Sequence, residues 1–399
     1  MNILVTGSAG FIGANLVLRL LDEGLQGESV RIVGLDNLND YYDPSLKEYR
    51  LNLIEKKIAE HPEHQYRFIK ADLADKSLID NLFAEEQFDI VVNLAAQAGV
   101  RYSITNPDAY IQSNIIGFYN ILEACRHSYD QTENGQWSMV RSATTGDACV
   151  AERSKNAQQS KDNLRPPTSD LRPSTYKGVR HLVYASSSSV YGGNKKVPFS
   201  TDDRVDNPVS LYAATKKSNE LLAHAYSKLY NIPSTGLRFF TVYGPAGRPD
   251  MAYFGFTNKL VKGDTIQIFN YGNCRRDFTY VDDIVEGIIR VMQHAPEKAV
   301  GEDGLPIPPY KIYNIGGGQP ENLLDFVTIL QEELIRAGVL PADYDFEAHK
   351  ELVPMQPGDV PVTYADSTAL ERDFGFVPRI TLREGLRHFA EWYAAYHNL

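Results

Sequence analysis

A short apolar segment that runs straight into three regularly spaced glycines constrains the fold of this chain more than any other feature. Residues 2–7 read Asn-Ile-Leu-Val-Thr-Gly, and a helical apolar period continues to about Glu23. Such a run is typical of a buried parallel strand. Strand, glycine turn and helix are the context that a dinucleotide fingerprint requires. We therefore expect the pyrophosphate of a dinucleotide near Gly7, Gly10, Phe11, Ile12 and Gly13.

Each glycine has its own expected task. Gly7 allows the tight turn, Gly10 lets the backbone approach the pyrophosphate, and Gly13 lets the helix pack on the strand. The spacing is Gly-x-x-Gly-x-x-Gly, whereas the general fingerprint reads Gly-x-Gly-x-x-Gly. The alternative is a glycine-rich turn without a ligand, and the next strand argues against it.

A second predicted strand, residues 30–36, ends in an acidic residue. Asp36 lies 23 residues after Gly13, near the spacing of the carboxylate that binds the adenosine ribose hydroxyls. A carboxylate there repels a 2′-phosphate, so we expect NAD rather than NADP, with Asn37 also at the cofactor. The alternative, an aspartate that caps a helix or a loop, is common.

Further strands are expected at residues 66–70, 89–94, 179–185 and 234–244, with helices between them. This alternation predicts a parallel sheet with right-handed crossovers and ligands at the carboxyl ends of the strands. The predicted fold class is α/β, a Rossmann-type doubly wound parallel sheet with a smaller α/β C-terminal substrate-binding region. Further candidate cofactor residues, at or after the strand ends, are Asp72, Leu73, Leu94, Ala95, Ala96, Gln97, Ser186 and Phe239.

The composition along the chain predicts two regions and one insertion. Residues 1–243 are expected to form the NAD-binding domain, and residues 244–399 a region that binds the substrate. In the second region, a short strand is expected at 267–272. A strand at 311–315 is expected to return from this region to the main sheet. Residues 129–177 are rich in polar residues and lack a hydrophobic period, so we expect a long insertion. We place it on the face opposite the cofactor, without a catalytic role, and a partner-binding role stays open.

A helix is expected from Asn106-Pro-Asp108 to about His127, with Asn114 inside it. Asparagine is mildly unfavourable in a helix, so Asn114 is a candidate for a role of its amide at the cofactor. A solvated asparagine is an equally good interpretation.

The most informative polar stretch is Ser210–Lys217, which places Tyr212 and Lys216 four residues apart in a helical pattern. That spacing puts both side chains on one face of the helix. Tyr66/Lys70 and Tyr191/Lys195 show the same spacing, but the first lies in a predicted strand and the second spans glycines. An amphipathic surface pair is the alternative interpretation.

A phenol beside an ammonium group is one way to build a general base. Tyrosine has a reference pKa of about 10. A cation about 4 Å away, at an effective dielectric near 20, is worth roughly 4 kcal/mol, or about 3 pKa units. We therefore expect Lys216 to bring the Tyr212 pKa close to neutral, where a general base works best.

Composition excludes several other classes of protein. The net charge of -11 and the pI near 5.4 argue against a nucleic-acid partner. No apolar run is long enough for a membrane helix, and the N-terminus lacks the basic region of a signal peptide. The three cysteines, Cys125, Cys149 and Cys274, form no metal or redox motif and suit a reducing compartment. We expect a cytoplasmic protein without a metal site or a membrane partner.

In chain order, these residues resemble the extended short-chain dehydrogenase/reductase family of nucleotide-sugar epimerases and dehydratases. The resemblance covers nearly the whole chain apart from the insertion. It rests on Gly7-x-x-Gly-x-x-Gly13, Asp36-Asn-Leu38, Asn93–Ala96, Ser186-Ser187, Tyr212-x-x-x-Lys216 and Arg276-Asp-Phe278. Three stretches, 93–103, 210–220 and 237–251, resemble the members that act on UDP-glucuronate. The resemblance implies a tightly held NAD and a UDP-sugar substrate. It also implies a homodimer through helices near 107–127 and 208–230.

The resemblance also implies a mechanism, 4-epimerisation of UDP-glucuronate to UDP-galacturonate through a 4-keto sugar. Tyr212 would take the proton of the 4-hydroxyl, with Ser187 sharing that hydrogen bond, and Lys216 would hold the nicotinamide ribose. Ser189 is the alternative to Ser187 as the hydroxyl nearest the sugar. Activity on UDP-glucose, decarboxylation of UDP-glucuronate, and an NAD-binding regulatory protein without catalysis are the alternative functions.

Two departures from the family pattern bear on the substrate. Ser188 and Ser189 stand where 4,6-dehydratases have an Asp-Glu pair and uronate decarboxylases a Glu. Gln356 stands where many neutral-sugar epimerases have a second phosphate-binding Arg, so Arg276 is expected to carry more of the diphosphate charge. The candidate substrate-binding residues are Ser188, Ser189, Thr241, Arg248, Phe269, Arg276, Gln356 and Asp359.

Arg248 is the candidate for binding the uronate carboxylate, because arginine can hold a carboxylate with two parallel bonds. Capping a loop or contacting the diphosphate are its alternative roles.

Overall fold

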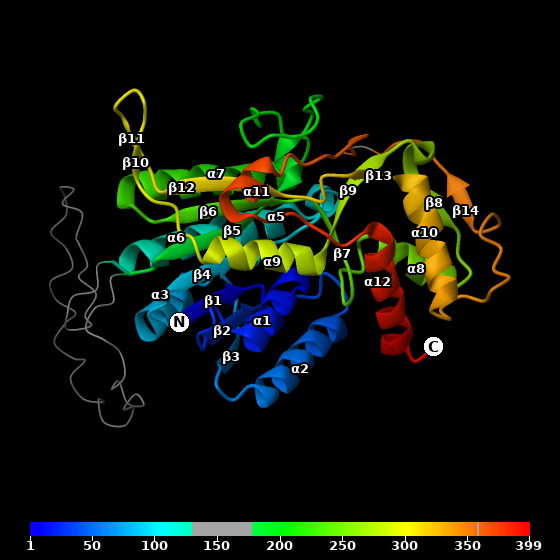
Figure 1. The fold of residues 1–399 in the computed structure, drawn as a ribbon, viewed down its shortest axis with the longest axis horizontal. Helices are drawn as coiled ribbons and strands as arrows, with labels where there is room; N and C mark the ends of the chain where they lie inside the picture. The colour runs from blue at the N-terminus through cyan, green and yellow to red at the C-terminus, as the bar shows by residue number, and fades with distance from the viewer. Residues whose placement is uncertain (130–177, 357–358) are drawn as a thin grey trace.

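A seven-stranded sheet forms the centre of the computed structural model, which describes residues 1–129, 178–356 and 359–399 (Figure 1). The strand order is β12-β6-β5-β4-β1-β2-β3, and every neighbouring pair is parallel. These strands are β1 (Asn2–Thr6), β2 (Arg31–Asp36), β3 (Gln65–Lys70), β4 (Ile90–Asn93), β5 (His181–Ser187), β6 (Ser234–Phe239) and β12 (Tyr310–Ile315). The predicted Rossmann-type α/β sheet is confirmed.

Helices cover both faces of this sheet, which explains its apolar strands. All residues of β1, β4 and β6 are buried, whereas the edge strand β3 is partly exposed. One face carries α1 (Phe11–Glu23), α2 (Ser45–Glu60) and α9 (Val281–Met292). The other carries α3 (Lys76–Glu86), α6 (Gly117–His127) and α7 (Leu211–Tyr230).

The order of the strands reverses at β1, which lies between β2 and β4. The loops that leave the carboxyl ends of β1 and β4 therefore diverge to opposite faces and leave a crevice, where ligands of doubly wound sheets bind. The register brings the two ends level, because Thr6 pairs with Asn93. The Thr6 hydroxyl donates to the Asn93 side chain at 2.7 Å, and it accepts from the Ala95 amide at 3.1 Å.

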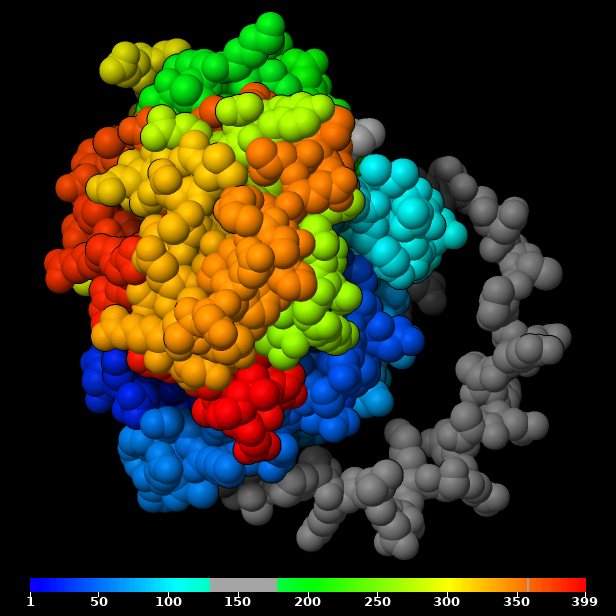
Figure 2. Space-filling view, turned by 90° about the vertical axis from the view of Figure 1, so that its right-hand side faces the viewer, coloured from blue at the N-terminus to red at the C-terminus, as the bar shows by residue number. Residues whose placement is uncertain are grey.

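The remaining C-terminal elements form a smaller α/β region, whose yellow to red atoms fill much of the face in Figure 2. A three-stranded sheet runs β13-β9-β7, and β8 pairs with β14. The strands are β7 (Thr241–Tyr243), β8 (Ile266–Ile268), β9 (Arg275–Tyr280), β13 (Pro320–Asn322) and β14 (Lys350–Leu352). The helices are α8 (Ala252–Val261), α10 (Leu323–Arg336), α11 (Thr368–Phe374) and α12 (Leu382–His397). β12 lies beside β6 in the main sheet, but the domain boundary after residue 243 stays a prediction.

Two predicted elements differ from the structure. The helix expected at 106–127 consists of α5 (Pro107–Tyr110), a π-helical turn (Ile111–Ile116) and α6, after a short α4 (Tyr102–Thr105). The strand expected at 267–272 ends at Ile268, because Asn270 and Tyr271 both have a φ of 52°. A positive φ is incompatible with an extended strand, and residues Phe269–Gly272 form a short 3₁₀ turn instead.

Short elements also occur between the main strands and helices. A 3₁₀ turn (Ser188–Tyr191) follows β5, and β10 (Ala299–Val300) pairs with β11 (Pro306–Ile307) in an exposed hairpin. Residues 130–177 of the predicted insertion lie outside the described residues, so its placement stays a prediction. None of the helices in the described parts of the chain is long and apolar enough to cross a membrane.

Candidate active site

Tyr212 and Lys216 lie one turn apart at the start of α7. The helix begins there because the Ser210 side chain caps it and accepts from the Ala213 amide at 3.1 Å. Lys216 is buried, and its Nζ donates to the carbonyl of Ala185 at 2.8 Å. The N-terminal part of α7 is thereby attached to the carboxyl end of β5, next to Ser186 and Ser187.

The serines at the end of β5 point to different partners. The Ser187 hydroxyl contacts the Tyr212 phenol and donates to Ser189 Oγ at 3.1 Å. The Ser186 hydroxyl instead donates to Glu220 Oε1 at 2.6 Å. Glu220 in turn pairs with the buried Arg238, whose guanidinium also donates to the Tyr191 phenol at 3.0 Å. Of these serines, Ser187 faces Tyr212, and Ser186 joins a buried network.

The expected near-neutral Tyr212 pKa is wrong for this structure. Burial raises the Tyr212 pKa above its ordinary value, and the opposing effects of Ser187 and Arg248 do not cancel it. The Lys216 ammonium is turned to the Ala185 carbonyl. Burial also lowers the pKa of Lys216 to about 8. Sequence spacing could place both side chains on one face, but it could not show where the ammonium points.

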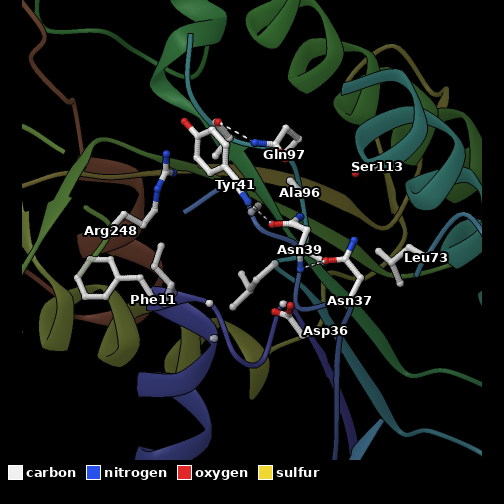
Figure 3. A pocket seen from close by; sticks show the side chains of 18 of the residues that line it. Phe11, Asp36, Asn37, Asn39, Tyr41, Leu73, Ala96, Gln97, Ser113 and Arg248 are labelled. Carbon is white, nitrogen blue, oxygen red and sulfur yellow. Dashed lines mark hydrogen bonds between the residues drawn. The ribbon is translucent and has the colours of Figure 1, made fainter. Parts of the chain in front are cut away.

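An inner cavity lies over the carboxyl ends of β1, β2 and β4 (Figure 3). Of the candidate cofactor residues, all but Asn114 line it. They are Gly7, Gly10, Phe11, Ile12, Gly13, Asp36, Asn37, Asp72, Leu73, Leu94, Ala95, Ala96, Gln97, Ser186, Tyr212, Lys216 and Phe239.

The glycine turn fits a dinucleotide because side chains would block it. A Cβ on Gly13 would lie 2.1 Å from the Gly7 carbonyl oxygen, and one on Gly10 would lie 2.9 Å from the same atom. Gly7 has a φ of 68°, and its Cβ would meet the Ala95 amide nitrogen at 2.8 Å. The turn is therefore as tight as the fingerprint predicts.

Asp36 follows Leu35, whose carbonyl accepts from the Gly7 amide at 2.7 Å, so it lies beside the glycine turn. Its own partners were missed by sequence reasoning. Its Oδ1 accepts from the Leu38 amide at 2.9 Å and lies 3.6 Å from the Nζ of Lys47. Lys47 is buried, which lowers its pKa, and it also donates to Asn39 at 3.1 Å. The sequence position of Lys47 on α2 did not indicate this contact, because Lys47 reaches Asp36 only through the path of the loop between β2 and α2.

Asn114 lies behind the wall of the inner cavity rather than in it. It is buried, its Nδ2 donates to the Gln97 carbonyl and to Thr215 Oγ1, both at 3.0 Å, and its Oδ1 accepts from the Gln97 amide at 2.8 Å. The amide therefore has a role, but that role is to join the loop after β4 to α7.

An outer cavity opens on the other side of Tyr212 and is lined by every candidate substrate residue. These are Ser188, Ser189, Thr241, Arg248, Phe269, Arg276, Gln356 and Asp359. Both cavities share Tyr41, Ser187, Tyr212, Phe240, Arg248 and Met251 in their linings. A ligand in one cavity can therefore meet a ligand in the other at Tyr212.

Two arginines that line the outer cavity lie near Asp359. One of them, Arg101, is not among the predicted site residues. Arg101 Nη2 lies 3.7 Å from Asp359, and Arg276 Nη2 lies 3.9 Å from the same carboxylate. The Arg101 guanidinium also stands 5.1 Å from the centre of the Phe269 ring. Arg101 follows the carboxyl end of β4, a position at which sequence alone could have suggested a ligand contact.

Arg248 stands near Tyr212 and already has a partner. Its Nε donates to Asp250 Oδ1 at 3.0 Å, and the Tyr41 hydroxyl donates to Asp250 Oδ2 at 3.1 Å. Figure 3 shows Arg248 and Tyr41 on the same side of the inner cavity.

Among the described residues, no cluster of three metal-ligating side chains occurs.

The fold and these two cavities are typical of enzymes that bind a dinucleotide on a doubly wound sheet next to a second ligand, with a tyrosine lining both cavities. Within this class, the model of the NAD dependent epimerase/dehydratase family matches residues 3–316. The chain belongs to that family.

Individual relatives are similar over the whole chain. UDP-glucuronate 4-epimerase 4 of Arabidopsis thaliana is 40% identical over 100% of this chain and 76% of its own length. A probable UDP-glucuronate 4-epimerase of Rhizobium meliloti is 37% identical over 98% of this chain and 97% of its own. The structure of UDP-glucuronic acid 4-epimerase from Bacillus cereus, in complex with UDP-glucuronic acid and NAD, has a TM-score of 0.72 and 27% identity, and the match covers 100% of both chains.

Proposed function

We propose that this protein converts UDP-glucuronate to UDP-galacturonate by NAD-dependent 4-epimerisation through a 4-keto sugar. The observation that carries the proposal is the meeting of the two cavities at Tyr212, with Arg248 within the lining of both. The similarity to relatives named as UDP-glucuronate 4-epimerases supports the choice of sugar.

NAD would be held by the residues of the inner cavity, with its pyrophosphate on the Gly7–Gly13 turn and its adenosine ribose at Asp36. When bound, NAD supplies the acceptor and later the donor of the C4 hydride. Lys216 keeps N–H donors beyond the one given to Ala185, and these suit the hydroxyls of the second ribose.

The protein's own part in the chemistry is proton transfer and positioning. Tyr212 takes the proton of the 4-hydroxyl as the C4–H bond breaks, and it returns a proton when the keto group is reduced. Ser187, which contacts the phenol, shares the hydrogen bond to that oxygen. The raised Tyr212 pKa means that the base depends on the positive charges near it, among them Arg248.

A neutral sugar is the second candidate, and one observation favours it. Asp250 pairs with Arg248, so part of the charge that would attract a uronate carboxylate is already compensated. An assay of the purified protein against UDP-glucuronate, UDP-glucose and their 4-epimers separates the two. The proposal expects turnover of the uronate pair to exceed that of the neutral pair, and a preference for UDP-glucose would overturn it.

We also propose a homodimer through α7 and the helices around 107–127. Apolar side chains on these helices are exposed, with Leu221 60% and Leu229 68% exposed on α7 and Ile111 40% exposed. Sedimentation of the purified protein should give a dimer, and Leu221→Glu should shift it toward monomer. Because the described cysteines Cys125 and Cys274 are free and buried, we propose a reducing compartment, the cytoplasm.

A further inference from the structure

Residues 37–50, which run from the end of β2 through the first turns of α2, contact the loop that carries Arg248 at two separate points. Tyr41 donates its hydroxyl to Asp250 Oδ2 at 3.1 Å. Arg50 donates from Nη2 to the carbonyls of Ala246 at 2.7 Å and Gly247 at 2.9 Å. The two contacts lie on either side of Arg248 in the sequence. The residue proposed to bind a carboxylate is therefore held from both directions.

Arg50 fixes the backbone that leads into Arg248. Its side chain is 1% exposed, and it also donates to the Ala9 carbonyl at 3.0 Å and the Tyr42 hydroxyl at 2.8 Å. Ala246, one of its acceptors, has a φ of 50°, a conformation that costs energy for any residue with a Cβ. A planar guanidinium can serve all these acceptors at once, whereas an ammonium group cannot.

Tyr41 determines how Asp250 meets Arg248. Asp250 accepts from Arg248 Nε at 3.0 Å and from Arg248 Nη2, and the latter bond ends on the same Oδ2 that accepts from Tyr41. The Tyr41 ring packs at 4.8 Å from the Tyr102 ring. Burial raises the pKa of Tyr41 to about 12, so its hydroxyl remains a donor at neutral pH. The Asp250 carboxylate therefore accepts from both Arg248 and Tyr41, and the bond from Tyr41 holds it in place.

This arrangement has a consequence for any anion that approaches Arg248. The guanidinium has five N–H donors, and the pair with Asp250 uses two of them. As long as Tyr41 holds Asp250, the carboxylate cannot follow the guanidinium when it turns toward a ligand. Without the Tyr41 hydroxyl, Asp250 would compete freely with an incoming carboxylate for the same cation.

We propose that Tyr41 and Arg50 are positioning residues that keep Arg248 available for the substrate carboxylate, so that they set the preference for a uronate over a neutral sugar. The inference rests on the proposed function in its choice of substrate. It concerns residues that are distant in sequence from the tyrosine–lysine pair and that act through Asp250 and the 246–247 backbone.

The test measures binding rather than turnover, with the NAD-loaded Tyr212→Phe protein as the parent. Calorimetric titration gives the Kd for UDP-glucuronate and for UDP-glucose. Adding Tyr41→Phe should weaken UDP-glucuronate binding about ten- to twentyfold, the lower end of what a hydrogen bond to a charged group contributes, and change UDP-glucose binding less than about twofold. Arg50→Lys should lower the same preference in protein that still melts cooperatively.

Tyr49→Phe is the matched control, because Tyr49 lies in the same segment 37–50 and its hydroxyl accepts from Trp392 Nε1 at 3.2 Å. It should leave both constants unchanged. If the parent prefers UDP-glucuronate and Tyr41→Phe keeps that preference, the inference is wrong and the proposed function stands. If the parent shows no preference for UDP-glucuronate, the proposed function and the inference both fall.

Discussion

Glu220 and Arg238 form a buried ion pair beneath the end of β5, joined by two N–H···O bonds of 2.8 and 2.9 Å. Glu220 lies on α7, two turns after Tyr212, and Arg238 lies on β6. Burial raises the Glu220 pKa, but Arg238 and Ser186 outweigh it and hold the pKa below its ordinary value. The pair therefore fixes the helix that carries Tyr212 against β6, the neighbour of the strand β5 that carries Ser187.

Removing one partner of this pair should destabilise the protein strongly. Glu220→Gln leaves the Arg238 charge buried without its counter-ion, so we expect the free energy of unfolding to fall by about 3–5 kcal/mol. Denaturant unfolding measures this. Replacing both residues, with Glu220→Met and Arg238→Met, should recover much of the loss. A single variant as stable as the parent would show that the pair does not stabilise the helix.

Tyr212→Phe should keep NAD binding and lower turnover by roughly 10²–10⁴-fold, the usual contribution of a positioned general base. Turnover of UDP-glucuronate and the NAD released on denaturation are the two measurements. Tyr226→Phe is the control on the same helix, since its hydroxyl donates to Glu123 at 2.7 Å, away from both cavities. Near-normal turnover in Tyr212→Phe would end the assignment.

Lys216 should make stability depend on pH in a defined window. Burial lowers its pKa from 10.5 to about 8 in the folded protein. Between these two values the unfolded chain binds more protons, so the free energy of unfolding rises with pH, by about 3 kcal/mol over the window. Below about pH 8 the buried charge destabilises the fold, and this effect disappears as the pH rises to 10.5.

Comparison with Lys216→Met isolates this effect from the other groups that titrate. The variant should gain stability relative to the parent at pH 7 and lose that advantage by pH 10. Unfolding free energies at both pH values measure the difference. A difference that is the same at both would mean that Lys216 keeps its ordinary pKa in the fold.

Arg248→Leu should weaken use of UDP-glucuronate far more than any use of UDP-glucose, by about tenfold or more for a lost charged contact. A 4-keto uronate is a β-keto acid that can lose CO₂, so the variant should also release some UDP-pentose. Product analysis and KM for both sugars test this. Equal effects on the two sugars would remove the main physical support for a uronate and favour UDP-glucose 4-epimerisation.

Much of the fold and both cavities could be predicted from the sequence. The glycine turn and Asp36 meet in one cavity because strand order alone brings the carboxyl ends of β1 and β2 together. Ser187 and Tyr212 lie close together because Ser187 ends β5 and Tyr212 begins the helix α7, which follows β5 and starts at the same edge of the sheet. These predictions needed only periodicity and the topology of a parallel sheet.

Contacts that depend on irregular loops could not be predicted. Tyr41 and Asp250 are 209 positions apart and meet through the path of two loops. Arg101 reaches Phe269 in a similar way, across two regions of the chain. The direction of the Lys216 ammonium was equally inaccessible, because a helical spacing places a side chain without specifying which acceptor its terminal atoms find.

The pairing of β12 with β6 has a consequence for synthesis of the protein. All six residues of β6 are buried, and β12 supplies the neighbour on its outer side. While a ribosome makes the intervening residues, the growing sheet ends in an apolar strand with unpaired backbone groups. Such an edge favours association with other chains. The sheet acquires its final border only when residues 310–315 have emerged, so a chain terminated before them is expected to aggregate.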